Sequence, residues 1–313
     1  MPKTAKKPAD YILPLYMNGL SGRMLRMAPP KNKKREMLFV GGHHTSHERI
    51  FGVIEFINRY GGVTVPDLPG FGGMEPFYKI GEKPTLDNMA DYLAAFIKLR
   101  YRNKRLSVVG FSYGFAVVTR MLQKSPEMAK KIDLLVSFAG MTNKKDFRLR
   151  RRTVLMLHIL SFILSFRLPA LFVRYGIFNG PLIRLGYRLF EPVFIKSEYS
   201  KVRDNKDLWR QRVDFEVGLW QDNDLRTWAV TSITMFKLDL SGKHIDLPVN
   251  HVSISSDRYF DNLKVEEHMR KIYKDFKICK ATVPTHAPSV IATSSQAAPY
   301  IPADIRRMMN KKV

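Results

Sequence analysis

Short apolar runs and helical segments alternate along the first half of the chain, and this order constrains the fold more than any other feature. Consecutive parallel strands need a long crossover connection, which is usually a helix. The strand-like runs are 36–40, 63–65, 105–109 and 132–138, and apolar residues recur at helical spacing within 50–57, 85–101 and 115–123. Before them, 11–18 and 20–27 have the pattern of two paired strands around the turn residues Asn18 and Gly19. The sequence therefore predicts an α/β fold with a mostly parallel sheet.

The alternation stops after the fourth run and resumes near the C-terminus. Residues 143–246 hold helical and irregular basic segments without a convincing strand, whereas 252–255, 263–276 and 277–283 follow the order strand, helix, strand. An insertion of roughly 100 residues within an α/β sheet is long enough to form a unit of its own. We therefore expect a core made of residues 1–142 and 247–313, and a helical, basic insertion at 143–246.

The pentapeptide Gly110-Phe111-Ser112-Tyr113-Gly114 lies between a predicted strand and a predicted helix. A serine on so tight a turn has a strained backbone and projects its hydroxyl from the edge of the sheet. Side chains two residues away on either side would clash, which explains glycine at 110 and 114. We therefore interpret Ser112 as a nucleophile.

With this turn the chain resembles the α/β-hydrolase fold family, and the resemblance extends over nearly all residues outside the insertion. Residues 110–114 resemble the family's nucleophile elbow, 67–73 resemble its Asp-x-x-Gly-x-Gly turn, and Gly41-Gly42-His43 is similar to its oxyanion loop. Many members have His-Gly where this chain has Gly41-Gly42. The resemblance implies an α/β-hydrolase fold with helices on both faces of the sheet, and an insertion that forms a helical cap over the active site.

Serine chemistry needs a base that takes the hydroxyl proton and an acid that orients this base, and in this fold the acid and then the histidine follow the serine. His286, just after the last predicted strand, is similar in position to the family's catalytic histidine. Asp257 directly follows the predicted strand 252–255 and is the expected acid. Asp261 is the alternative, because the turn within 256–262 can shift by a few residues.

Acyl transfer also needs backbone donors for the negative oxygen of its intermediate. We expect the N–H groups of Tyr113 and His43 to supply them. His43, His44 and His47 suggest a metal site as a second interpretation, but no set of carboxylates or cysteines completes it. The sequence therefore predicts neither a metal nor a cofactor.

Basic residues dominate the charge of the chain. Lys and Arg number 52 against 28 Asp and Glu, which gives a net charge of +24 and favours an anionic partner. Residues 143–212 alone hold 16 Lys and Arg against 5 Asp and Glu. Nucleic acid is not an expected partner, because no aromatic platform or reading helix accompanies this charge.

The apolar run 154–166, part of a helix expected over 153–166, lies within this basic stretch and is shorter than the roughly 18 to 20 residues that span a bilayer. One interpretation is that it packs the cap onto the core. The other is an anchor on an anionic membrane surface, with its apolar face in the lipid boundary. The arginines expected to meet lipid headgroups are Arg148, Arg150, Arg151, Arg152, Arg167 and Arg174.

These features together predict a serine hydrolase that cleaves an ester-type bond of a small hydrophobic acyl substrate. The same residues serve amide, thioester and carbon–carbon cleavage, so the bond type stays open. The alternative is a non-catalytic protein of this fold that binds an anionic membrane or an acidic partner through the basic insertion. A single cysteine, Cys279, cannot form an internal disulfide, and we expect a cytoplasmic protein, with peripheral attachment to the inner face of a membrane as an open alternative.

Overall fold

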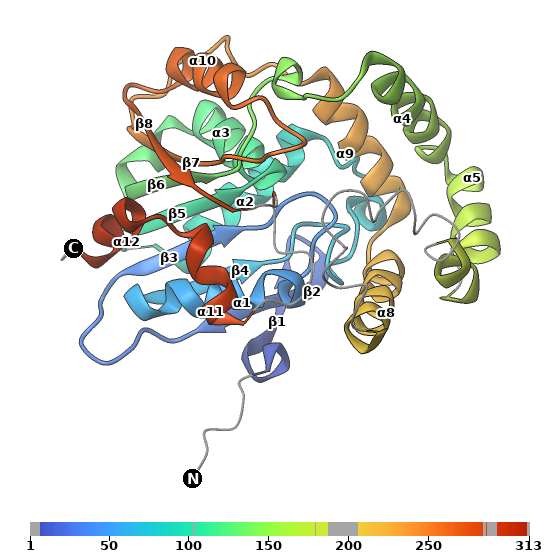
Figure 1. Cartoon of the computed structure of the whole chain (residues 1–313), viewed down its shortest axis with the longest axis horizontal. Coiled ribbons are helices and arrows are strands. Elements are labelled where there is room, and N and C mark those ends of the chain that lie inside the picture. The colour runs from blue at the N-terminus through green and yellow to red at the C-terminus, as the bar shows by residue number, and fades with distance from the viewer. Residues whose placement is uncertain are drawn as a thin grey trace.

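The computed structural model describes residues 7–102, 104–178, 180–186, 206–283, 286 and 293–311. Its centre is one eight-stranded sheet with the strand order β1-β2-β4-β3-β5-β6-β7-β8 (Figure 1). The strands are β1 (Ile12–Met17), β2 (Leu20–Met27), β3 (Glu36–Val40), β4 (Gly62–Pro66), β5 (Leu106–Phe111), β6 (Ile132–Phe138), β7 (Val249–Ile254) and β8 (Phe276–Ala281).

The predicted mostly parallel sheet is confirmed. β1 and β2 form an antiparallel hairpin, and β2 also pairs antiparallel with β4, but every other neighbouring pair is parallel. The hairpin turns at Asn18 and Gly19, which have φ values of 54° and 78°, as a two-residue turn with positive φ at both positions requires. The parallel strands thus end at one common edge, where the loops that follow them come together.

Helices cover both faces of this sheet. One face carries α2 (Leu86–Arg100), α3 (Tyr113–Lys124) and α10 (Asn262–Ile272), and the other carries α1 (His47–Ile57), α11 (Ser294–Ala297) and α12 (Ala303–Asn310) (Figure 1). Successive residues of β3 point to opposite faces, so that Leu38 packs against the first set of helices and Phe39 against the second. All six residues of β5 are buried, as expected for a central parallel strand.

Short helical turns connect these elements. They are η1 (Pro8–Tyr11), η2 (Asn58–Tyr60), η3 (Phe77–Ile80), η4 (Pro126–Lys131), η5 (Lys144–Asp146), η6 (Val173–Ile177) and η8 (Ala298–Tyr300). The start of α2 illustrates the local control of element ends: the side chain of Thr85 accepts a hydrogen bond from the N–H of Asn88 and caps the helix.

Between β6 and β7 the described residues form helices and no named strand. The helices are α4 (Arg151–Leu164), α5 (Arg167–Phe172), α8 (Lys206–Asp222) and α9 (Leu225–Lys237). α4 packs on α9, and Figure 1 shows α4 and α5 at the edge of the molecule farthest from the sheet. The division of residues 143–246 from the core as a separate domain stays a prediction.

In the described ranges, no single helix is long and apolar enough to cross a membrane. Only α4 and the helical segment Arg167–Ile177 together have that length and composition, and the two are bent by 96° relative to each other.

Two predicted helix ends differ from the structure. The helix expected over 263–276 ends at Ile272, because Tyr273 adopts an extended backbone and Phe276 begins β8, where its ring stacks on His251 of the neighbouring strand. The helix expected over 153–166 ends at Leu164, and Phe166, also extended, caps α5. The contact of Phe276 with the neighbouring strand is one that helical spacing does not report.

Candidate active site

Ser112 occupies the sharp turn between β5 and α3. Its backbone has φ 50° and ψ −120°, a conformation that a residue with a side chain rarely adopts. The N–H of Ser112 donates a 3.0 Å hydrogen bond to the carbonyl of Phe138 at the end of β6, which holds the turn against the neighbouring strand. The strained serine expected from the pentapeptide is therefore present in the structure.

The two glycines of the pentapeptide permit close approaches of the backbone. A Cβ on Gly114 would lie 2.3 Å from the carbonyl oxygen of Gly41 and 2.4 Å from that of Val40. A Cβ on Gly110 would lie 2.7 Å from the Cα of Phe115. Neither contact has room for a side chain, so the glycines allow α3 to begin directly against β3 and β5.

His286 and Asp257 form a close pair after the ends of β8 and β7. Nδ1 of His286 lies 2.7 Å from Oδ2 of Asp257, and the carboxylate is only 2% exposed. Its second oxygen accepts hydrogen bonds from the N–H groups of Tyr259 and Phe260 at 2.8 and 3.1 Å. Burial alone would raise the pKa of Asp257, but the hydrogen bonds from His286 and the two backbone groups outweigh burial and lower this pKa.

Asp261 has a different role in the structure. Its side chain caps α10 by accepting hydrogen bonds from the N–H groups of Leu263 and Lys264 at 3.1 and 3.4 Å. Of the two candidate acids, Asp257 is thus the one in contact with His286.

Three aromatic rings surround the His286 imidazole. The ring centroids of Phe111, Tyr259 and Phe260 lie 5.6, 5.2 and 5.1 Å from that of His286. They restrict the orientation of the imidazole beyond what the contact with Asp257 provides. No sequence motif marks these rings, although Tyr259 and Phe260 stand only two and three positions after the predicted acid.

Ser112 and His286 line one cavity of about 390 Å³. No hydrogen bond links Ser112 Oγ to His286 in the described structure. Such bonds are often long or poorly aligned until a substrate is bound, so their absence is compatible with catalysis. The other lining residues are His43, His44, Thr45, Arg49, Phe111, Phe147, Leu149, Leu157, Trp228, Ser232, Met235, Phe236, Arg258, Tyr259 and Phe260.

One expected oxyanion donor is on the residue that follows the serine, and the other is on His43, which lines the same cavity. His43 follows β3 and Tyr113 follows Ser112, and within the described ranges neither backbone N–H has a hydrogen-bond partner. The imidazole of His43 is fixed separately, since its Nε2 lies 3.0 Å from Oγ1 of Thr231 on α9. Burial lowers the pKa of His43 to about 4, so this ring is neutral near pH 7.

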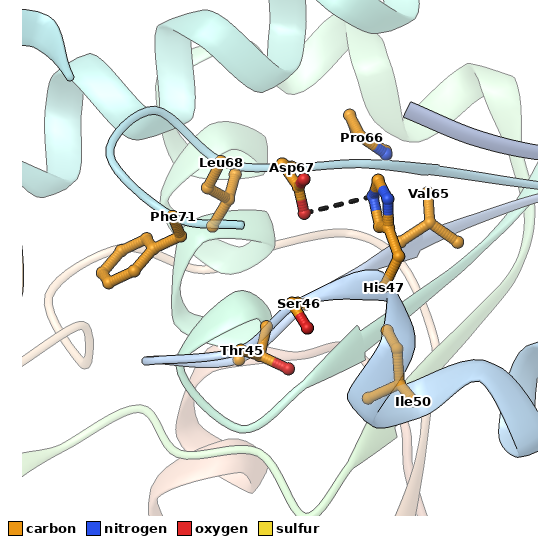
Figure 2. A pocket seen from close by; sticks show the side chains of 11 residues that line it. Thr45, Ser46, His47, Ile50, Val65, Pro66, Asp67, Leu68 and Phe71 are labelled. Atoms are coloured by element: carbon orange, nitrogen blue, oxygen red, sulfur yellow. Dashed lines mark ion pairs between the residues drawn. The ribbon is translucent and has the colours of Figure 1, made fainter. Parts of the chain in front are cut away.

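A partly buried polar cluster braces the loop that carries His43. Figure 2 shows His47, from the start of α1, facing Asp67, which follows β4, and Nε2 of His47 lies 3.1 Å from Oδ1 of Asp67. The guanidinium of Arg23 pairs with Asp67 at 2.9 Å and with Glu48 at 2.7 Å. The cluster links the loop after β3 to the turn after β4, the two segments that match the family's motifs on this side of the serine.

The three histidines of the possible metal site point to separate partners. His43 contacts Thr231, His44 lies 2.9 Å from the amide nitrogen of Asn223, and His47 faces Asp67. In the part of the chain that is described, no group of three or more His, Cys, Asp or Glu side chains is arranged to hold a metal ion.

Two of the arginines expected to meet lipid headgroups also bond to backbone carbonyls. The guanidinium of Arg148 donates to the carbonyl of Asp257 at 3.1 Å. That of Arg174 donates to the carbonyls of Asn223 and Gln221 at 3.0 and 2.7 Å. Arg148 thereby ties the first residues of the insertion to the loop that carries the acid.

No protein-family model and no curated protein matches this sequence. Among solved structures, the chain is similar to an α/β-hydrolase enzyme from a deep-sea metagenome library of the Medee basin, with 12% identity, a TM-score of 0.67, and coverage of 96% of this chain and 98% of that one. An epoxide hydrolase from Bacillus megaterium is 14% identical, with a TM-score of 0.65 and coverage of 96% and 100%. An esterase from Thermogutta terrifontis is 14% identical, with a TM-score of 0.60 and coverage of 96% and 98%. The chain has the α/β-hydrolase fold, as the motifs predicted.

Proposed function

We propose that this chain is a serine hydrolase that cleaves an ester bond of a hydrophobic acyl substrate. The observation that carries the proposal is that Ser112, on its strained turn, lines the same cavity as His286, which is paired with Asp257. The similar structures include an esterase and an epoxide hydrolase, so the fold alone leaves the reaction open. A serine with a histidine and a buried carboxylate favours acyl transfer.

In the proposed reaction, Oγ of Ser112 attacks the ester carbonyl carbon while Nε2 of His286 takes the hydroxyl proton. The contact with Asp257 keeps a proton on Nδ1 of His286 and stabilises the imidazolium that forms. The N–H groups of His43 and Tyr113 donate to the negative oxygen. The alcohol leaves with the proton from His286, and water then hydrolyses the acyl-enzyme by the same route.

The lining of the cavity supports a hydrophobic acyl group. Leu149, Leu157, Met235 and Phe236, all from the segment between β6 and β7, contribute to its wall. Removing apolar surface from water contributes about 25 cal/mol per Å² to the free energy of binding. A longer acyl chain therefore binds more tightly until it fills the cavity.

A fluorophosphonate probe and a series of acyl esters graded by chain length test this proposal. We expect the probe to label the wild type, and Ser112→Ala to lose the label and at least about 10⁴-fold in turnover, since the nucleophile is removed. Ser295→Ala, at an exposed serine of α11, is the control and should keep both. Full turnover of Ser112→Ala, or a wild type that the probe does not label, contradicts the proposal.

A second candidate function, attachment to an anionic membrane, is favoured by the outer side of α4 and α5. Met156, Leu168 and Phe172 are 64%, 78% and 70% exposed there. We name this outer side the apolar face, and its exposed residues are Leu155, Met156, Ile159, Leu160, Phe162, Ile163, Phe166, Leu168, Leu171 and Phe172. So large an exposed apolar surface is unusual on a monomer and marks an interaction site.

The positive charges around the apolar face favour an anionic partner. Arg151, Arg152 and Arg167 are exposed at helix starts beside it, and with the described residues they form no ion pair. An apolar surface bordered by free cations fits an anionic phospholipid bilayer, which offers acyl chains and negative headgroups together.

Flotation with vesicles of phosphatidylcholine, with and without phosphatidylglycerol, tests the membrane proposal. We expect binding to the anionic vesicles that weakens as salt rises from 0.05 to about 0.5 M, because salt screens the arginines. Phe162→Glu should abolish binding, whereas Leu99→Glu, at an exposed leucine of α2, should not. Binding equal for both variants, or no binding at low salt, contradicts attachment. Binding without probe labelling would favour the non-catalytic alternative.

A further inference from the structure

A second cavity, of about 500 Å³, adjoins the candidate active site and is lined by basic side chains. We name it the basic cavity. It lies between η5, the first turns of α4, the end of α9 and the start of α10, and its lining residues are Lys144, Lys145, Phe147, Leu149, Arg151, Val154, Leu155, His158, Phe236 and Lys264. Four lysine and arginine side chains and no acidic side chain contribute to it.

The described residues leave the lysines of the basic cavity without an ion-pair partner. Lys144, Lys145 and Lys264 are exposed, and none has an ion-pair partner in the ranges that the structure describes. The nearby acids contact other side chains, although the charge of Lys145 contributes to lowering the pKa of Glu267. Asp146 is buried against His268 at 2.6 Å, and Glu267 pairs with Lys271. An anion entering this cavity would therefore meet several cations at once.

The first turn of α4 adds partial positive charge at the same place. Its N-cap is Arg150, whose side chain has no acceptor atom, and the first turn contains no acidic residue. The free N–H groups at the start of such a 14-residue helix favour a negative group, such as a phosphate. Arg151 belongs both to this turn and to the lining of the cavity.

The basic cavity and the candidate active site share part of their walls. Phe147, Leu149 and Phe236 line both. The two cavities are therefore adjacent at these three side chains.

From these observations we infer that the substrate is an anionic amphiphile: an acyl ester whose alcohol part carries a phosphate-like group, held by Lys144, Lys145, Arg151 and Lys264. This inference rests on the proposed function, because it assigns the substrate class of the same site. It does not depend on attachment to a membrane, since a soluble phosphorylated ester offers the same group.

The test compares two short, soluble esters, 1-butyrylglycerol and 1-butyrylglycerol 3-phosphate, which differ only in the phosphate. We expect kcat/KM to be about tenfold higher for the phosphorylated ester, mainly through KM, because charge-assisted hydrogen bonds bind the phosphate. This preference should disappear in the triple variant Lys144→Gln/Lys145→Gln/Lys264→Gln, while hydrolysis of the neutral ester stays unchanged. Lys83→Gln/Lys98→Gln/Lys130→Gln removes as many exposed charges outside both cavities and should keep the preference.

A binding measurement separates failure of this inference from failure of the proposed function. Ser112→Ala should bind the non-hydrolysable ether 1-O-butylglycerol 3-phosphate in equilibrium dialysis, and the three cavity substitutions should remove this binding even if no ester is hydrolysed. Hydrolysis of both esters at equal kcat/KM overturns the inference and leaves the proposed function standing. Inorganic phosphate should compete only weakly. If it binds as tightly as the ether, the cavity is a site for free phosphate and the substrate assignment is wrong.

Discussion

At the scale of single residues, three of the five described non-glycine residues with positive φ lie beyond the ends of parallel strands. Ser112, His44 and Ala139 have φ values of 50°, 51° and 45°, and each follows the end of a parallel strand. The N–H of Ser112 donates to the end of β6, and that of Ala139 donates to Val252 of β7 at 2.9 Å. Backbone strain of this kind costs of order 1 to 3 kcal/mol per residue and persists only where surrounding contacts impose it. Its position beside the candidate nucleophile supports a functional reason for it.

The choice between the two candidate acids gives a residue-scale prediction. Asp257→Asn keeps the shape of the side chain but removes the carboxylate that orients His286, so we expect kcat to fall by about 10⁴-fold in the wild-type fold. Asp261→Ala removes the cap of α10 instead, which should lower the free energy of unfolding by about 1 kcal/mol and leave kcat intact. Ester kinetics and urea unfolding of both variants check this. The reverse pattern would make Asp261 the acid.

At the scale of elements, the features that the sequence predicts correctly are those that depend on residues close together in the chain. β3 and β6 have the predicted bounds, and the turn at Ser112 has the expected strain, because strand runs and tight turns depend on neighbouring residues. The end of α10 and the rings of Tyr259 and Phe260 around His286 depend on contacts between distant segments, which no residue pattern records.

The junction of α3 with β3 gives an element-scale prediction. In Gly114→Ala the new methyl group would lie within 2.4 Å of two carbonyl oxygens at the end of β3, so α3 or the loop that carries His43 must move. We expect a loss of about 1 to 3 kcal/mol in the free energy of unfolding, with a fall in kcat because an oxyanion donor shifts. Gly242→Ala is the control, because a Cβ there meets no atom within 4 Å. A variant with wild-type stability and kcat would show that the close approach has no consequence.

At the scale of the whole molecule, the fold buries neutral imidazoles inside a chain of net charge +24. His251 is 1% exposed, with Nδ1 2.9 Å from Oγ of Ser137, and burial lowers its pKa from 6.5 to about 4. Burial likewise lowers the pKa of His47 to about 3. At these two histidines the unfolded chain therefore binds more protons than the folded one between about pH 4 and 6.5. The stabilisation from each neutral ring is complete above pH 6.5 and is lost as the pH falls through this window.

This linkage predicts an acid-sensitive fold with a measurable share from His251. Between pH 7.5 and pH 5, a shift from 6.5 to about 4 accounts for a loss of about 2 kcal/mol in the free energy of unfolding. His251→Gln cannot take up this proton, so its free energy of unfolding should fall by about 2 kcal/mol less than that of the wild type over the same interval, whatever its stability at pH 7.5.

Asp67, whose pKa burial raises, acts in the opposite direction, but it is present in both proteins and cancels in the comparison. Urea unfolding at the two pH values measures the difference, with His244→Gln, at an exposed histidine, as the control. Equal losses in the wild type and His251→Gln would mean that His251 takes up its proton equally in the folded and unfolded chains.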